Sequence, residues 1–293
     1  RETEAEMSRW GPRPMLSKRF YKAHGLGNDY LVFEEGSEWI ATPDKVAEIC
    51  NRNHGVGADG IVVLLGELLE GLPQLRMFNP DGSEFERSGN GLRILAAYLY
   101  QEDRVGDTPF EVTVGGDLVR MTVHDVQDGI YDISVEMGQA RVGPDSVGLN
   151  ASSLDGSGRI LGPDGSLLNV IPVSIGNPHL VVFVPEVSNT MLESLGPFLT
   201  THSDLSNGAN VQLVGPLAGN RLEAAIWERG VGPTSASGTS ACAVAVAAIW
   251  SKKLDPGAVM VDTIGGSLEV HVNVELEVVL RGPVTEVCTG TLI

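Results

Sequence analysis

Residues 77–100, MFNPDGSEFERSGNGLRILAAYLY, decide how the fold of this chain is interpreted. A turn rich in Asn, Asp and Gly leads to Ser88-Gly89-Asn90-Gly91, and apolar residues then recur at helical spacing through residues 92–99. This pattern predicts a helix that begins at Ser88. The free amides of a helix's first turn attract anions, and glycines leave those amides uncovered, so the segment can form an anion site. Taken alone, Ser88 fits the role of a simple N-cap.

A second copy of this pattern lies 149 residues further on. Residues 234–250, TSASGTSACAVAVAAIW, place Ser237-Gly238 ahead of another small, apolar helical run. Two more pairs of landmarks recur at offsets of 149 and 150 residues, which are Gly27-Asn28 with Gly176-Asn177, and Gly115-Gly116 with Gly265-Gly266. Aligned landmarks at one spacing indicate an internal repeat, so we expect two similar halves.

The repeat suggests a kind of chemistry. If the halves pack about a pseudo-twofold axis, the helix starts at Ser88 and Ser237 would face each other across a cleft, each offering amides and one hydroxyl. Such a site suits a reaction in which a proton leaves one face of a carbon and another arrives on the opposite face. The sequence therefore favours racemisation or epimerisation.

Length, composition and charge exclude several classes of protein. The 293 residues suit two domains, and 42% apolar residues suffice for a core in each. The net charge of −18 disfavours nucleic acid and anionic membranes as partners, because both need a basic footprint. No apolar run reaches the roughly 20 residues of a membrane span, and no signal-peptide pattern is found. Three dispersed cysteines fit a reducing compartment, so we expect a cytoplasmic protein.

The order of predicted elements indicates an α+β fold with largely antiparallel pairing. In the first half we expect strands within residues 20–34, a helix at Thr42–Asn53, and strands at 110–124 and 130–137. The second half repeats the plan, with strands at 170–174 and 180–184, a helix near 188–199, a strand ending at Glu228-Arg229, and then the Ser237 helix. We expect a flexible leader at 1–17, one lobe at 18–137 and a second lobe at 138–283, the boundary being a connection rich in Gly, Ser, Asp and Pro at 138–170.

Cofactor chemistry finds little support in the sequence. Gly55, Gly57 and Gly60 match the dinucleotide fingerprint, but they follow a predicted helix and open a strand, which is the reverse of what that motif requires. The six histidines show no metal-ligand spacing, and neither a Walker loop nor a pyridoxal phosphate lysine signature is present. We therefore expect no metal and no cofactor.

Four polar residues beside the repeat landmarks have competing interpretations. Asn28 at a turn tip can simply serve the turn, although its repeat partner Asn177 favours a ligand contact. His179 can be a satisfied histidine at a strand end, and Glu228-Arg229 a surface ion pair. In the functional interpretation, these last residues polarise a base and grip a charged substrate.

With these residues assembled, the sequence resembles diaminopimelate epimerase, an enzyme of lysine and cell-wall precursor synthesis within the cofactor-independent racemase fold that includes proline racemase. The resemblance covers nearly all of residues 20–293, in the motifs KAHGLGNDYLVF, GVGADG, FNPDGSE, SGNGLR, SIGNPH, NVQLV and ERGVGPTSASGTSAC. It implies two pseudo-symmetric lobes, each a mixed, largely antiparallel sheet around a central helix, that close over a small-molecule substrate. It also implies that a last strand at 284–293 returns to the first lobe. Whether the chain forms a homodimer is left open.

The resemblance also implies roles for particular residues. The reacting carboxylate would be held by the backbone around Gly89-Asn90 and Gly238-Thr239. The rest of a diaminopimelate-like substrate would be held by Asn28, Asn79, Asn177, Asn210, Glu228 and Arg229. Ser88 and Ser237 would stand at the positions of the two proton carriers, with His179 and Glu228 assisting them.

The sequence departs from the family pattern at these proton carriers. The family has cysteines where Ser88 and Ser237 stand, and Pro233 and Ser235 replace residues of its GETLACG run. A thiol has a reference pKa near 8.5 that a helix start lowers further, whereas a serine hydroxyl normally needs an adjacent base. Three interpretations follow. The first is a diaminopimelate epimerase lineage, either engineered with serine in place of both cysteines or natively divergent and slow. The second is a related isomerase or dehydratase whose base is His179 or Glu228, and the third is a non-catalytic diamino-acid-binding protein.

Overall fold

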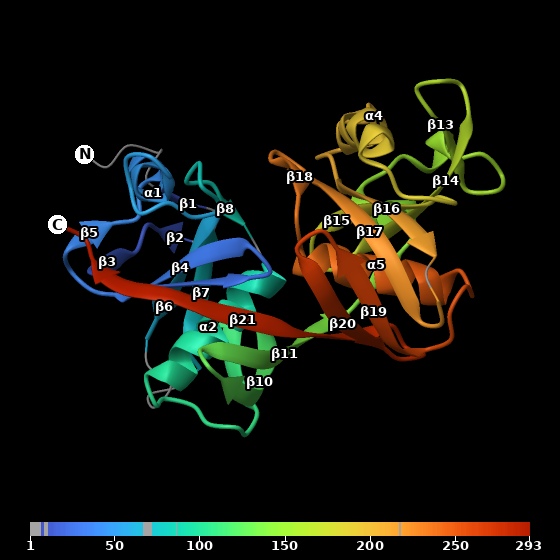
Figure 1. Cartoon of the computed structure of the whole chain (residues 1–293). Helices are drawn as coiled ribbons and strands as arrows, with labels where there is room; N and C mark the ends of the chain where they lie inside the picture. Colours follow the sequence, from blue (N-terminus) through green and yellow to red (C-terminus); the bar gives the residue numbers. More distant parts are fainter. Residues whose placement is uncertain (1–6, 9–10, 67–71, 86, 217) are drawn as a thin grey trace. The chain divides into compact units, whose positions relative to one another are not determined.

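The computed structural model describes residues 7–8, 11–66, 72–85, 87–216 and 218–293. The chain divides into two compact units (Figure 1). Unit 1 comprises Arg1–Val135 with Pro283–Ile293, and unit 2 comprises Glu136–Gly282. Residues 1–6 and 9–10 of the expected leader lie outside the described residues. Among the described residues, no helix combines the length and the apolarity that a bilayer crossing requires.

Unit 1 is a mixed sheet with the strand order β21-β3-β4-β6-β7-β9-β10-β11. Two neighbouring pairs, β4·β6 and β7·β9, are parallel, and the other pairs in this order are antiparallel. The strands are β3 Met15–Gly25, β4 Asn28–Glu35, β6 Gly60–Leu65, β7 Gln74–Phe78, β9 Phe110–Val114, β10 Asp117–Gln127, β11 Ile130–Gln139 and β21 Glu277–Thr291, with short β1 Met7–Ser8, β2 Gly11–Pro12, β5 Trp39–Ile40 and β8 Glu84–Phe85. The helices are α1 Pro43–Cys50 and α2 Gly89–Gln101.

Unit 2 has the strand order β12-β14-β15-β16-β17-β19-β20-β21, with β15·β16 and β17·β19 parallel. The strands are β12 Arg141–Val142, β14 Leu167–Ser174, β15 Pro178–Phe183, β16 Asn210–Pro216, β17 Arg221–Glu228, β19 Gly257–Thr263 and β20 Gly266–Val272, with short β13 Arg159–Leu161 and β18 Gly232–Thr234. The helices are α3 Pro144–Val147, the 3₁₀ helix Ala151–Ser153, α4 Asn189–Thr200 and α5 Gly238–Trp250.

The two units repeat one topology. In each unit the two parallel pairs of strands occupy the same places in the strand order. The register of the first parallel pair is also equivalent, since Tyr30 pairs with Gly60 in unit 1 and His179 pairs with Asn210 in unit 2. The predicted pair of similar halves in an α+β, largely antiparallel fold is therefore confirmed.

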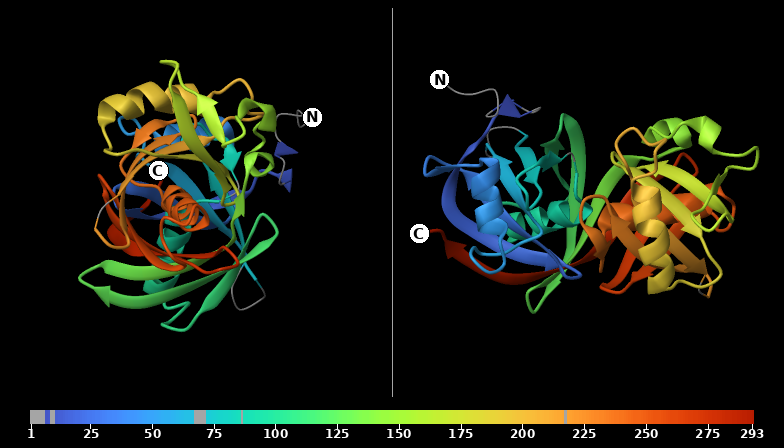
Figure 2. Two further views of the ribbon diagram at one scale, coloured as in Figure 1. Left: turned by 90° about the vertical axis from the view of Figure 1, so that its right-hand side faces the viewer. Right: turned by 90° about the horizontal axis from the view of Figure 1, so that it is seen from above.

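Helices α2 and α5 lie at the core of their units. Residues 89–99 of α2 and 238–249 of α5 are buried throughout. Helix α5 is almost entirely small and apolar on every side, so it must be covered on every side, and the left view of Figure 2 looks along it with strands around it. Both helices begin directly after the predicted serines, so the expected starts at Ser88 and Ser237 are confirmed.

Smaller differences from the sequence prediction have local causes. Strand β3 begins at Met15, ahead of the expected strand within residues 20–34, because Met15 and Leu16 pair with β5. Gly115 and Gly116, both at positive φ, form a turn that splits the expected strand at 110–124 into β9 and β10. The connection at 138–170 carries structure of its own, and its Val147, Leu149 and Ile160 join the core of unit 2.

Two strands run through the boundary between the units. Residues 130–135 of β11 pair with β10 in unit 1, and β12, just downstream, pairs with β14 in unit 2. Residues 278–281 of β21 pair with β20 in unit 2, and residues 285–291 pair with β3 in unit 1. Each half of the repeat thus ends in a strand that continues into the other unit.

Candidate functional site

In unit 1 the candidate site is built on the first turn of α2. Ser88 is the N-cap, and its Oγ accepts a hydrogen bond from the Gly91 amide at 3.0 Å. Its carbonyl accepts from the Leu92 amide at 2.9 Å, the first bond of the helix. The sequence pattern of a serine followed by glycines thus forms a capped helix start, as expected.

The side chain of Asn90 connects this helix start to the β3–β4 turn. Asn90 is 2% exposed and donates from Nδ2 to Asn28 Oδ1 at 2.8 Å. Asn90 Oδ1 accepts from Arg93 Nη2 at 2.6 Å, and the fully buried guanidinium also reaches the Gly89 carbonyl at 3.4 Å. The structure therefore brings Asn28, Gly89 and Asn90 together, three residues that the sequence assigned to one site.

A charged cluster lies behind Asn28. Asn28 Nδ2 donates to Asp59 Oδ2 at 3.1 Å, and Arg52 binds both Asp59 and Asp29, at 2.7 and 2.6 Å. Lys22 forms a further ion pair with Asp29 at 3.0 Å. Burial opposes ionisation of Asp29, but hydrogen bonds from Arg52 and Lys22 outweigh it and hold the pKa of Asp29 below its usual value. Burial raises the pKa of Asp59.

Asn79 lies in a turn at the end of β7. Its Nδ2 donates to Ser83 Oγ at 3.0 Å, and its backbone amide donates to the Ser83 carbonyl at 2.8 Å. These bonds close the Asn-Pro-Asp-Gly turn ahead of α2. A substrate contact for Asn79 stays a prediction.

In unit 2 the corresponding first turn belongs to α5. Ser237 is its N-cap and is 6% exposed, but its side chain makes no capping bond, unlike that of Ser88. Thr239 and Ser240, which follow in the first turn, are also buried. Because the two repeat-related hydroxyls differ in their use, the helix starts are not chemically identical.

A line of hydrogen bonds connects this turn to the interior of unit 2. Asn177 Nδ2 donates to Thr239 Oγ1 at 3.3 Å, and Asn177 Oδ1 lies 2.9 Å from His179 Nε2. Gln212 Nε2 lies 3.1 Å from His179 Nδ1 and donates to Ser240 Oγ at 3.0 Å. The predicted residues Asn177, His179 and Thr239 therefore lie together, joined through Gln212, which the sequence analysis did not single out.

His179 is neutral in this setting. Its ring is fully buried, and burial lowers the pKa of His179 to about 3, with Arg229 acting in the same direction and Gln212 against it. Since the Gln212 amide nitrogen donates to Nδ1, the proton is on Nε2 and points to Asn177 Oδ1. A group with this pKa is a poor base near neutral pH, which argues against His179 as the alternative proton carrier.

Asn210 and Arg229 form a second cluster of predicted residues. Asn210 Oδ1 accepts from the Arg229 backbone amide at 2.9 Å, and Asn210 Nδ2 donates to the Pro178 carbonyl at 3.3 Å. The exposed Arg229 side chain reaches the Asn207 carbonyl at 2.6 Å. Glu228 is the half-buried last residue of β17. Asn210 thus ties the ends of β15, β16 and β17 to one another.

The segment that resembles a dinucleotide fingerprint has another structural role. It connects α1 to β6, so Gly55, Gly57 and Gly60 follow a helix and open a strand, as predicted. Within the described ranges, no group of three or more His, Cys, Asp or Glu side chains is placed to hold a metal ion.

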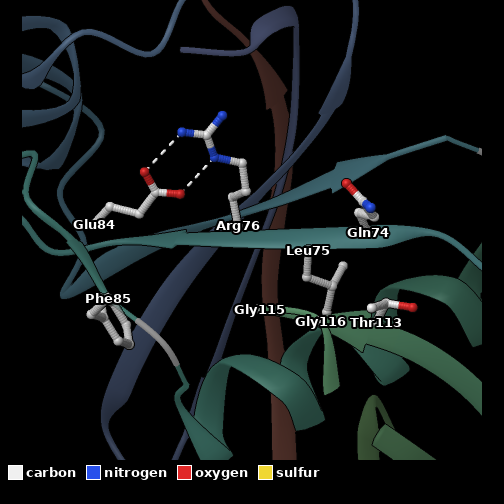
Figure 3. Close-up of a pocket in the computed structure, with 8 residues that line it drawn as sticks. All are labelled: Gln74, Leu75, Arg76, Glu84, Phe85, Thr113, Gly115 and Gly116. Carbon is white, nitrogen blue, oxygen red and sulfur yellow. Dashed lines mark hydrogen bonds and ion pairs between the residues drawn. The ribbon is translucent and has the colours of Figure 1, made fainter. Parts of the chain in front are cut away.

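A hollow of about 210 Å³ in unit 1 is lined by Gln74, Leu75, Arg76, Glu84, Phe85, Thr113, Gly115 and Gly116 (Figure 3). Its one guanidinium, that of Arg76, is held by Glu84 through two bonds of 2.6 and 2.8 Å. None of the predicted site residues lines this hollow, so we do not assign it to the site.

Comparison with known proteins decides the family. A model of the family described as diaminopimelate epimerase matches residues 20–143 and 171–287. Diaminopimelate epimerase of Bacillus pumilus is 34% identical over 285 residues, covering 94% of this chain and 99% of the relative. The chain belongs to the diaminopimelate epimerase family. Diaminopimelate epimerase of Bacillus cereus is 36% identical over 281 residues, covering 92% and 96% of the two chains.

Solved structures of lower identity share the diaminopimelate epimerase-like fold. A structure described as a predicted epimerase from Pseudomonas aeruginosa has 19% identity and a TM-score of 0.69, covering 94% of this chain and 99% of its own. A probable proline racemase from Agrobacterium radiobacter has 15% identity and a TM-score of 0.70, covering 94% and 92%. The resemblance drawn from the sequence motifs is therefore confirmed for both the family and the fold.

Proposed function

We propose that this protein is a cofactor-independent epimerase that interconverts LL- and meso-diaminopimelate by moving a proton at the α-carbon. Ser88 and Ser237 are the two proton carriers of the proposal. The first-turn amides after them, around Gly89-Asn90 and Gly238-Thr239, bind the reacting carboxylate.

The observation that carries this proposal is the duplicated helix start within a member of this family. In each repeat a serine occupies the N-cap position of a buried helix, and the second residue of that helix is bonded to an asparagine 62 residues away, Asn28 for Asn90 and Asn177 for Thr239. Helix starts with free amides bind carboxylates, since the helix dipole favours negative charge there. A serine beside each such turn suits a substrate whose α-carbon exchanges a proton on both of its faces.

The remaining predicted residues take substrate-holding roles. We propose that Asn79, Asn210, Glu228 and Arg229 hold the second, non-reacting end of the diamino diacid, where one carboxylate and one ammonium need opposite charges. Glu228 also assists proton transfer. His179 acts through Asn177, as a neutral donor that sets the orientation of that amide.

The serines set the speed of the proposed reaction. A serine hydroxyl has little access to its anion near neutral pH, and among the residues that the structure describes no hydrogen bond joins either hydroxyl to a basic side chain. Loss of a general acid or base slows a proton transfer by about 10²–10⁴-fold. We therefore propose a slow epimerase with an intact substrate site.

Solvent exchange tests the function directly. The enzyme, incubated with meso-diaminopimelate in deuterium oxide, should place deuterium at the α-carbon. Mass spectrometry or proton NMR measures this incorporation. Calorimetric binding of diaminopimelate without any exchange would favour the non-catalytic interpretation. Absence of both binding and exchange would refute the proposal.

We also propose a cytoplasmic location, on the basis of the dispersed free cysteines and the biosynthetic role.

A further inference from the structure

A chain of hydrogen bonds in unit 1 carries opposite charges at its two ends. Asn28 Nδ2 donates to Asp59 Oδ2 at 3.1 Å, Asn90 Nδ2 donates to Asn28 Oδ1 at 2.8 Å, and Arg93 Nη2 donates to Asn90 Oδ1 at 2.6 Å. An ionised carboxylate only accepts and a guanidinium only donates, so the ends fix the direction of every bond between them. If either asparagine amide were rotated by 180°, it would place an acceptor oxygen against another acceptor and an N–H group against another N–H group.

We propose that Asp59 and Arg93 are positioning residues, which hold the amides of Asn28 and Asn90 in the one orientation that offers N–H groups to a ligand carboxylate. This inference rests on the proposed function. Each amide nitrogen carries two hydrogens, and in the described part of the chain each donates to one protein acceptor. The second hydrogen of each stays available for the substrate.

The surroundings of Arg93 are shaped for this arrangement. The side chain is 0% exposed and its Nη1 also reaches the Gly89 carbonyl at 3.4 Å. A Cβ atom at Gly25 would lie 2.8 Å from Arg93 Nη2 and 3.1 Å from Asn90 Oδ1. Such distances are too short for van der Waals contact, so glycine at position 25 gives the pair its room.

Asp59 is itself held on both of its oxygens. Oδ1 accepts from Arg52 Nη2 at 2.7 Å, while Oδ2 accepts from the Asp29 amide and from Asn28, each at 3.1 Å. An asparagine in its place has one oxygen for these two sets of donors. Its NH₂ group would therefore face either Arg52 or Asn28, and the second choice reverses the polarity of the chain.

Calorimetric titration with meso-diaminopimelate tests the proposal, using wild type, Asp59→Asn and the exposed control Asp44→Asn on α1. We expect the Kd of Asp59→Asn to rise at least tenfold and that of the control to stay within twofold of wild type. Asp59→Glu, which keeps an acceptor and the charge, should recover part of the loss, which a purely steric role would not produce. Gly25→Ala should weaken binding as Asp59→Asn does.

Each other outcome has one meaning. If wild type binds and Asp59→Asn binds equally well, the positioning role is refuted and the proposed function stands. If wild type shows neither binding nor exchange, the function is refuted, and the positioning role is decided separately by neutron diffraction of deuterated wild-type crystals. If Asp59→Asn does not fold, neutron diffraction of the wild-type crystals decides the positioning role in its place. Deuterons of Asn28 Nδ2 directed at Asp59 support the proposal, and deuterons directed at Asn90 overturn it.

Discussion

Asn28 and Asn177 occupy equivalent positions in the two repeats, yet their amides are turned in opposite senses. Asn28 accepts from the helix start, through Asn90 Nδ2 at 2.8 Å, whereas Asn177 donates to the helix start, at Thr239 Oγ1 and 3.3 Å. The first orientation is set by ions, Asp59 and Arg93, and the second by the neutral His179. A duplicated fold has thus acquired two chemically different halves, which suits an enzyme that binds two stereoisomers of one substrate.

Restoring thiols should accelerate the proposed reaction. Ser88→Cys combined with Ser237→Cys should raise α-proton exchange of diaminopimelate by about 10²-fold or more, because thiols at helix starts ionise far more readily than hydroxyls. Deuterium incorporation per minute is the measurement. Ser235→Cys, on an exposed position two residues before Ser237, is the matched control. An unchanged rate in the double variant would mean that these positions do not carry protons.

Glu228 should matter for substrate binding or turnover, unlike Glu223 on the same strand. Glu228→Gln removes a charge from a half-buried strand end, and we expect kcat/KM to fall about tenfold or more, in line with the loss of a charge-assisted hydrogen bond. Glu223→Gln, on an exposed position of β17, should leave the kinetics unchanged. Equal kinetics of the two variants would make Glu228 a structural residue.

Buried His179 should make the protein sensitive to acid. Its pKa is lowered to about 3 in the folded state, so between that value and its ordinary pKa the unfolded chain binds a proton that the folded chain does not. The contribution of neutral His179 to the free energy of unfolding is therefore fully present above about pH 6.5. It falls with decreasing pH by up to about 1.4 kcal/mol per pH unit.

Urea unfolding at pH 7, 6, 5 and 4 measures this effect. His179→Gln should show a shallower fall than wild type, whatever its stability at pH 7, while the exposed control His271→Gln should show the wild-type slope. Parallel curves for wild type and His179→Gln would show that His179 titrates normally.

A glycine in α4 should be required for packing against the strand that carries Glu228. A Cβ at Gly196 would lie 2.6 Å from the ring of Trp227, which must move aside. Gly196→Ala should lower the free energy of unfolding by about 1–3 kcal/mol, the usual cost of overpacking. Gly156→Ala, where a Cβ meets nothing within 4 Å, is the control, and urea unfolding is the measurement. Equal stabilities would show that Trp227 shifts freely.

Local pattern was sufficient to predict the elements that carry the site. Helical spacing after Ser88 and Ser237, and turn chemistry at Gly27 and Gly176, depend on neighbours in sequence, and the structure places helices and turns there. The repeat then predicted two halves of one topology, and the family resemblance supplied what that topology is.

The connections between elements were not predictable in the same way. Asp59 sits in a glycine-rich turn, and only the parallel pairing of β4 with β6 brings its amide to the Asp29 carbonyl and its carboxylate to Asn28. In the sequence, Gln212 is one polar residue in a predicted strand. Its full burial beside His179 could not be predicted, because it depends on α5 packing against the sheet. A polar residue within the otherwise apolar segment 211–214 was the one available signal.

Strand β21 imposes an order on synthesis. The part of β21 that pairs with β3 is residues 285–291, which are synthesised more than 250 residues after β3. Unit 2, by contrast, is one continuous stretch, Glu136–Gly282. The N-terminal sheet must therefore keep the β3 edge open to other chains until residues 285–291 have been synthesised, and a chaperone that shields β3 during this interval would raise the yield of native protein.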